Sequence, residues 1–208
     1  MNNINVDNLR AVVKNLLKEN RFIHTLGVEK EAYKLGQIFI PDKCEKLAIT
    51  GLLHDITKNF SLEQQLELCD KYQIKVDRNN ISFKLLHAKT GAEFAREQFG
   101  ECLVDEEIYN GIYFHTTGRE KMTLFEAIIY LADYIEENRT FEDCVFLREY
   151  FYKSLEKAKN MKEKKEILRN TMILSFDLTI KNLISENKTI DFDTIKARNY
   201  FIDNFESF

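Results

Sequence analysis

The 208-residue chain contains one proline, seven glycines and no tryptophan, so the residues that punctuate loops are scarce. β-Sandwiches and β-barrels join many short strands through turns that need glycine or proline, so this scarcity argues against both and favours long helices. Long apolar runs are also missing, because no window approaches the ~18 consecutive apolar residues of a membrane span. Residues 1–9 are polar and lack the apolar region of a signal peptide. The sequence therefore predicts a cytoplasmic protein with no membrane partner.

An excess of positive charge is missing as well. Lysine and arginine number 30 against 34 aspartates and glutamates, which gives a formal net charge of −4. Nucleic-acid binding relies on a cationic surface that neutralises phosphates, so no nucleic-acid partner is expected. The lysine-rich stretch 153–165 is interleaved with Glu156 and Glu163, which favours a solvated helix face over a nucleic-acid patch. The four cysteines form no C-x-x-C pair, so they predict reduced, mostly buried thiols rather than a zinc ribbon.

What the sequence does contain is a helical spacing of apolar residues along most of its length. Asp7 is placed to cap a first helix, whose predicted inward face is Leu9, Val12, Val13, Leu16 and Leu17. The spacing predicts further helices over residues 21–40, 61–72, 83–99, 105–115 and 123–135, and an apolar stretch over 47–53. Three more amphipathic helices are expected between residue 138 and about residue 205.

Helix boundaries are marked by specific residues. Ser61 with Gln64, and Thr123 with Glu126, match the capping-box pattern that opens a helix. Pro41 should break the chain after the second helix. Gly100 stands just past the helix predicted over 83–99, and residues 116–119 form a loop.

No segment alternates apolar and polar residues between turn signals, so the predicted fold class is all-α. We expect one domain over residues 1–208, with a motif-bearing helical core at about 21–139 and C-terminal helices over about 141–208. The aromatic stretch 150–152 belongs either to the core or to a homodimer surface, and the core is the favoured interpretation.

Histidine is rare in this chain, which has four: His24, His54, His87 and His115. A single histidine on a helix is more often a surface or satisfied core residue than a metal ligand. His54 differs because Asp55 follows it inside the apolar run 51–56. An ionisable pair in apolar surroundings is unfavourable unless something compensates both groups. A bound cation would do so, since neutral imidazole and carboxylate both bind first-row metals.

Asp133 is another ionisable residue in an apolar segment, within the helix predicted over 123–135. Two interpretations are open from the residues alone. Asp133 is either a buried aspartate paired with an arginine such as Arg139, or a metal ligand that joins the histidines.

Five ordered blocks of sequence contain all four histidines and both of these aspartates. They are residues 21–28, 48–58, 87–91, 115–119 and 131–139. The order of these residues, with a histidine first, then a His-Asp pair and finally a distant aspartate, resembles that of the HD superfamily of metal-dependent phosphohydrolases. The resemblance is closest to its YqeK-like branch. Glu137 stands where that pattern has proline, at a position that is not a ligand.

The resemblance implies a dinuclear metal centre. Its ligands would be His24, His54, Asp55, His87, His115 and Asp133. Asp55 would bridge two divalent or trivalent transition-metal ions, iron first and manganese second; zinc is compatible, but no cysteine joins the set. Two cations about 3.5–4 Å apart clamp the attacking and leaving oxygens of a phosphoryl displacement and lower the pKa of bound water toward ~7. A metal-bridging hydroxide would then act without a protein nucleophile.

Basic residues near these positions suggest a pocket for a polyphosphate, because such a substrate needs cations beyond the metals. Lys58 follows the His-Asp pair and Arg119 follows His115, although each could instead be an ordinary surface charge. Catalytic roles are assigned to Asp55 and Lys58. The candidate substrate-binding residues are Arg21, Thr57, Lys58, Thr116, Thr117, Gly118, Arg119 and Arg139.

The YqeK-like resemblance implies symmetrical hydrolysis of diadenosine tetraphosphate to two ADP molecules. The expected ligand is a dinucleoside polyphosphate, with ADP or GDP as a product-like ligand. One alternative is another HD phosphohydrolase, such as a nucleoside-monophosphate phosphatase or a cyclic-dinucleotide phosphodiesterase. A second alternative is a nucleotide-binding regulator without turnover, which the complete ligand set and Lys58 argue against.

Overall fold

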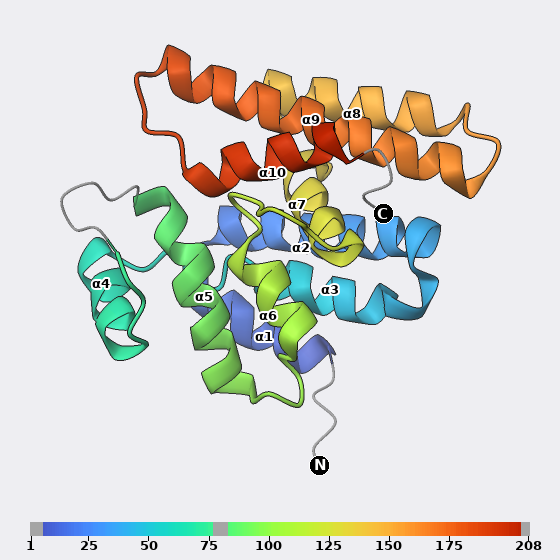
Figure 1. Ribbon diagram of the computed structural model, residues 1–208. Helices are drawn as coiled ribbons and strands as arrows, with labels where there is room; N and C mark the ends of the chain where they lie inside the picture. Colours follow the sequence, from blue (N-terminus) through green and yellow to red (C-terminus); the bar gives the residue numbers. More distant parts are fainter. Residues whose placement is uncertain (1–5, 77–82, 205–208) are drawn as a thin grey trace.

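The computed structural model describes residues 6–76 and 83–204, and within these ranges it contains helices and no strand (Figure 1). The predicted all-α fold is therefore confirmed. None of the helices in these ranges combines the length and apolar character needed to span a bilayer. The helices are α1 (Val6–Leu16), α2 (Glu19–Phe39), α3 (Cys44–Leu53), α4 (Leu62–Lys71), α5 (Phe83–Phe99), α6 (Glu106–Tyr113), α7 (Leu124–Ile135), α8 (Glu142–Leu155), α9 (Met161–Ser185) and α10 (Phe192–Asp203), with a 3₁₀ turn η1 (Pro41–Lys43) before α3.

Helix α7 lies at the centre of the fold, because most of its side chains are buried. Ile128, Leu131 and Ile135 are fully removed from solvent, and burial of a side chain of this size stabilises the fold by about 1.5–3 kcal/mol. Helices α2, α3, α6, α8 and α9 all contact α7. Polar side chains on α7 are therefore held in place by packing from several directions.

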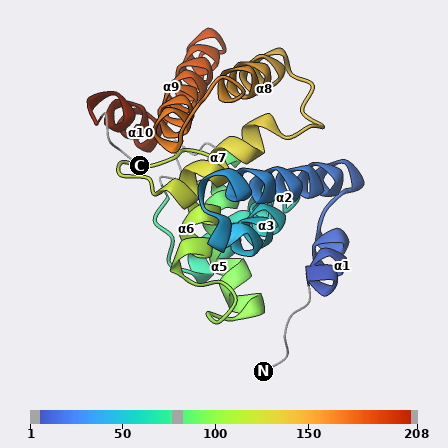
Figure 2. The same ribbon diagram turned by 90° about the vertical axis from the view of Figure 1, so that its right-hand side faces the viewer.

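Helices α8, α9 and α10 form a layer across the top of the molecule in Figure 1, above α7 and α2; Figure 2 shows the same layer from the side. Phe151, Phe176 and Phe201, one from each helix, are fully buried. The ring of Phe176 lies 4.8 Å from that of Tyr130 on α7, which joins the layer to the core. Phe151 thus belongs to the core, as favoured for the stretch 150–152, while the homodimer stays a prediction.

Most helix boundaries match the expected signals. Ser61 and Gln64 form a capping box at the start of α4, and Thr123 and Glu126 form another at the start of α7. Gly100 follows α5 with φ +80°, a conformation that favours glycine.

Three expectations differ from the structure. Asp7 was expected to cap the first helix but lies inside its first turn, because α1 begins at Val6. Helix α2 begins at Glu19, two residues earlier than predicted. Val12 was expected to face inward but is 43% exposed, because α1 buries only Leu9 and Val13 against the rest of the protein. A short terminal helix needs only a narrow apolar stripe, so an apolar residue beside that stripe stays at the surface.

Candidate metal centre

Six ionisable side chains from five parts of the chain converge in the interior. The elements that carry them are α2 (His24), the turn after α3 (His54 and Asp55), α5 (His87), the turn after α6 (His115) and α7 (Asp133). All four imidazoles and Asp55 are buried, and the Asp133 side chain keeps 18% of its surface exposed. The structure therefore brings together every residue that the sequence proposed as a ligand.

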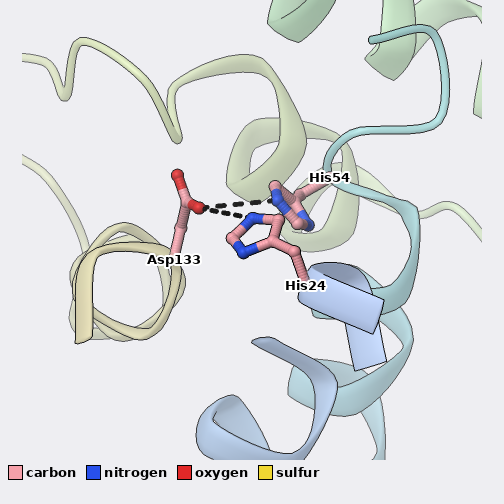
Figure 3. Close-up of side chains that lie close together, drawn as sticks. All are labelled: His24, His54 and Asp133. Carbon is pink, nitrogen blue, oxygen red and sulfur yellow. Dashed lines mark ion pairs between the residues drawn. The ribbon is translucent and has the colours of Figure 1, made fainter. Parts of the chain in front are cut away.

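One half of the centre consists of His24, His54 and Asp133, and Figure 3 shows these side chains pointing toward one another. Asp133 Oδ1 lies 3.0 Å from His24 Nε2 and 3.7 Å from His54 Nε2. Asp55 Oδ2 faces the same two imidazoles, 3.8 Å from His24 Nε2 and 3.4 Å from His54 Nε2. This half offers two imidazole nitrogens and two carboxylate oxygens.

The other half lies on the opposite oxygen of the same aspartate. Asp55 Oδ1 is 3.0 Å from His87 Nε2 and 3.6 Å from His115 Nε2. His87 Nε2 and His115 Nε2 are 3.1 Å apart. The two oxygens of Asp55 therefore face two different sets of imidazoles, which is the geometry of a carboxylate shared between two cation sites.

Hydrogen bonds to the protein orient three of the four imidazoles. Nδ1 of His54 donates to the Gly51 carbonyl oxygen at 2.6 Å, and Nδ1 of His115 donates to that of Ile112 at 2.7 Å. Nδ1 of His24 lies 3.0 Å from a carboxylate oxygen of Glu136. When Nδ1 carries the proton, the lone pair on Nε2 points into the centre, as metal coordination requires.

The electrostatics favour neutral imidazoles at His54 and His87 and ionised carboxylates at Asp55 and Asp133. Burial lowers the pKa of His87 to about 4 and also lowers the pKa of His54. Burial alone would raise the pKa of Asp55, but the surrounding imidazoles hold it well below its usual value. Burial acts the same way on Asp133, where the charge of Arg139 keeps the pKa well below the usual range. Neutral imidazole and ionised carboxylate are the forms in which histidine and aspartate bind metal ions. Burial alone would lower the pKa of His24, but the carboxylates of Asp133 and Glu136 raise it.

Three buried atoms of the centre have no hydrogen-bond partner within the described residues: His24 Nε2, His54 Nε2 and Asp55 Oδ1. A buried polar atom without a partner costs about 1–3 kcal/mol. Such atoms that converge from separate elements are what a cation would satisfy, so the donor set fits transition-metal ions.

Three cations surround this centre. Arg21 donates to Asp55 Oδ2 at 2.8 Å, and Arg139 donates to Asp133 Oδ1 at 2.5 Å. Lys58 Nζ lies 3.0 Å from His87 Nε2 and 3.8 Å from Asp55 Oδ1. The pairing of Asp133 with Arg139 and its place among the histidines were alternative interpretations from the sequence, yet both occur, because a carboxylate oxygen accepts more than one partner.

Comparison with known proteins identifies the family to which this chain belongs. The model of the HD domain matches residues 21–138, a range that contains every candidate ligand. The chain belongs to the HD family.

The similarity of this chain to relatives and to a solved structure extends over nearly its whole length. A protein of Halalkalibacterium halodurans named symmetrical bis(5'-nucleosyl)-tetraphosphatase is 34% identical to this chain, and the match covers 92% of this chain and 94% of that protein. A protein of Staphylococcus aureus with the same name is 32% identical, and the match covers 90% of this chain and 92% of that protein. A crystal structure of a predicted HD superfamily hydrolase involved in NAD metabolism from Clostridium acetobutylicum is 36% identical, with a TM-score of 0.81 over 96% of this chain and 97% of that one.

Several residues predicted to bind substrate either lie away from Arg21, Lys58 and Arg139 or form hydrogen bonds within the protein. The guanidinium of Arg119 donates to both oxygens of Glu126, at 2.9 and 2.7 Å. The Thr117 hydroxyl donates to the Gly118 carbonyl oxygen at 2.8 Å. Gly118 has φ +65°, and a Cβ there would press on Met122 and Phe176. These contacts support structural roles for the loop.

Two threonines complete the predicted set. Thr57 is fully buried beside the HD pair and donates to the His87 carbonyl oxygen at 3.0 Å, so its hydroxyl braces the turn that carries Asp55 against α5. Thr116 lines a separate cavity of about 510 Å³ between α5, α9 and α10. No contact among the described residues aims either hydroxyl at the centre.

Glu136 is a functional candidate that the sequence reasoning did not assign. It is 1% exposed, and besides His24 its carboxylate accepts hydrogen bonds from the backbone and side-chain amides of Asn138, at 2.7 and 3.0 Å. A Cβ at position 27 would clash with Glu136 Oε2, so Gly27 leaves the space that this carboxylate occupies. The available signal was spacing: Glu136 follows Asp133 by three residues and lies one helical turn further along.

Replacing Glu136 with glutamine should weaken metal binding or activity about 10–100-fold, because the partner that orients a metal-binding histidine typically contributes that much. The variant keeps the size of the side chain and removes the charge that supports His24. Competition with a chelator of known affinity measures the effect directly. The matched control is Glu137→Gln, since Glu137 is exposed and pairs with Lys30 at the surface. Equal metal affinity in Glu136→Gln and the wild type would contradict the orienting role.

Proposed function

We propose that this chain is a cytoplasmic, metal-dependent hydrolase that cleaves diadenosine tetraphosphate symmetrically into two ADP molecules. The observation that carries the proposal is Asp55, whose two oxygens face separate groups of imidazoles. Two-metal sites of this kind suit displacement at phosphorus. The relatives named symmetrical bis(5'-nucleosyl)-tetraphosphatase, which this chain matches over at least 90% of its length, support the choice of substrate.

The residues divide between the two metal positions by the oxygen of Asp55 that they face. His24, His54, Asp133 and Asp55 Oδ2 would hold one ion, and His87, His115 and Asp55 Oδ1 would hold the other. The mixed histidine and carboxylate donors suit iron first and manganese second. When bound, such ions lower the pKa of water and neutralise charge on the phosphoryl group.

The three cations bind the rest of the phosphate chain. Arg21 and Arg139 each donate to an aspartate of the centre and remain 29% and 24% exposed, so each retains donors that phosphate oxygens can reach. Lys58 lies beside His87, where it would donate to an oxygen of the attacked phosphate or of the leaving ADP. A tetraphosphate needs more neutralising charge than a monophosphate does, so this set of cations suits the longer chain.

The experiment that tests this function is product analysis with metal-loaded protein. Diadenosine tetraphosphate should give the highest kcat/KM among nucleotides, with ADP as the only product, and ADP should inhibit competitively. In water enriched in ¹⁸O, each cleavage should place one labelled oxygen on the terminal phosphate of one of the two ADP molecules. Chromatography with mass spectrometry measures both results. AMP with ATP as products would contradict the symmetrical cut, and turnover of monophosphates alone would favour another HD phosphohydrolase.

A further inference from the structure

A cavity of about 540 Å³ opens beside one half of the metal centre. Its volume falls in the range of about 300–1,000 Å³ that small-molecule sites occupy. His24, Arg21 and Arg139 form the wall that adjoins the ligands, and Asn59 and Phe141 form another part of the lining. A nucleotide whose phosphates lie at the arginines would therefore have space for its nucleoside inside this cavity.

Phe141 is the aromatic residue of that lining, and 68% of its surface is exposed. Singly exposed aromatic residues are common at protein surfaces, but Phe141 is distinguished by its place in the wall of a cavity that adjoins the candidate metal centre. A phenyl ring offers a nucleobase a flat apolar face, and stacking of this kind tolerates any base because every base has a π-face.

The segment that carries Phe141 is fixed before any ligand arrives. Arg148 on α8 donates to the carbonyl oxygens of Glu136 and Arg139, at 2.9 and 2.6 Å. The Phe141 carbonyl oxygen accepts the first backbone hydrogen bond of α8, from Val145 at 3.0 Å. Because the backbone of this segment is already ordered, binding does not pay the entropy cost of ordering a loop, which strengthens stacking.

Asn59 supplies a polar group in the same cavity. Its Oδ1 accepts from the backbone amide of Lys18 at 2.7 Å, which fixes the orientation of the side chain. The amide NH₂ group can then donate to an acceptor nitrogen of a base. The cavity thus combines a stacking face, a fixed donor and two arginines that bind phosphate.

We propose that Phe141 is the stacking platform for the nucleobase of one ADP half, whose phosphates extend past Arg21 and Arg139 to the metal centre. The proposal rests on the proposed function and adds to it a residue that binds the base. Phe141 would bind the base, while Arg139 on the same segment after α7 would bind phosphate.

The test compares ADP with pyrophosphate, which shares the phosphates but has no base, as ligands of the metal-loaded full-length protein. Phe141→Ala should weaken ADP binding about 5- to 100-fold, the usual effect of removing an aromatic partner from a base. Pyrophosphate affinity should stay within about twofold, because the arginines are unchanged. Phe146→Ala is the matched control, since Phe146 is 53% exposed on α8 but lies outside the cavity lining. Calorimetry measures all of these affinities.

A second variant gives a direct optical signal. The chain contains no tryptophan, so Phe141→Trp introduces a single indole at the platform. ADP should quench its fluorescence and pyrophosphate should not, while ADP affinity stays at or above the wild-type value. Unchanged ADP affinity in Phe141→Ala, or equal losses for ADP and pyrophosphate, would overturn the platform. Wild-type protein that binds ADP through Phe141 but cleaves no dinucleoside polyphosphate would instead overturn the proposed function alone.

Discussion

Replacing Asp55 with alanine should lower kcat/KM for diadenosine tetraphosphate at least ~10³-fold, a loss of about 4 kcal/mol in transition-state stabilisation. The reason is the position of the carboxylate, which is 1% exposed and has one oxygen facing His54 while the other faces His87. No other carboxylate among the described residues contacts both sets of imidazoles. Its removal would therefore weaken both metal positions at once.

The variant should remain folded, because α2, α3 and α7 pack through apolar residues that do not depend on Asp55. Circular dichroism and thermal unfolding check this point. Asp55→Asn, which keeps the shape but loses the charge, separates the loss of charge from any packing defect and should also lose most activity. Asp42→Ala, at an exposed position in η1, should behave as the wild type. A folded Asp55→Ala enzyme with nearly full activity would rule out the shared-ligand role.

Removing the metals should have an effect of the same size. Protein purified without chelator should contain about two transition-metal ions per chain, mainly iron or manganese, because the donors exceed what one tetrahedral ion needs. Dialysis against a strong chelator should reduce activity at least ~10³-fold, and added Fe²⁺ or Mn²⁺ should restore it. Elemental analysis with an activity assay follows both quantities.

Single-ligand variants sharpen the metal prediction. His24 and His87 face different oxygens of Asp55, so His24→Ala and His87→Ala should each reduce the metal content from about two ions toward one. Arg119→Ala should keep the full content, since Arg119 pairs with Glu126. Fewer than half an ion per chain in the reconstituted wild type would refute the dinuclear centre.

The sequence predicted the helices well because their signals are local. Capping boxes and apolar spacing depend on residues within one or two turns, and tertiary packing did not oppose them at α4 or α7. The candidate ligands could also be predicted from the sequence, because a His-Asp pair in an apolar run is chemically unusual wherever it occurs.

Roles that depend on partners far away in the sequence were harder to predict. Arg119 follows His115 in the sequence and suggested a phosphate contact; its guanidinium pairs with Glu126, and the phosphate contact stays a prediction. Glu126 had already been interpreted as the capping-box residue, and only the structure shows that its carboxylate serves both the Thr123 amide and Arg119. A carboxylate with two oxygens can accept several donors, and sequence spacing does not say how many it has.

Glu136 needed three-dimensional information for a different reason. Its acidity alone suggested nothing, since glutamate is common near helix ends. The role of Glu136 follows from its contact with His24, 112 residues away in the sequence, and from the space that Gly27 leaves for its carboxylate. Neither relation has a local signature.

The hydrogen bonds from Arg148 to the segment after α7 also bear on how such an enzyme can change over evolutionary time. Every candidate metal ligand precedes residue 134, whereas Arg148 and the aromatic wall of the adjoining cavity follow residue 138. Mutations that alter the stacking face for the nucleobase can therefore accumulate after residue 138 while the stretch that encodes the candidate ligands is preserved. A descendant could acquire a new substrate by remodelling α8 and the residues before it, and would inherit the hydrolytic centre intact.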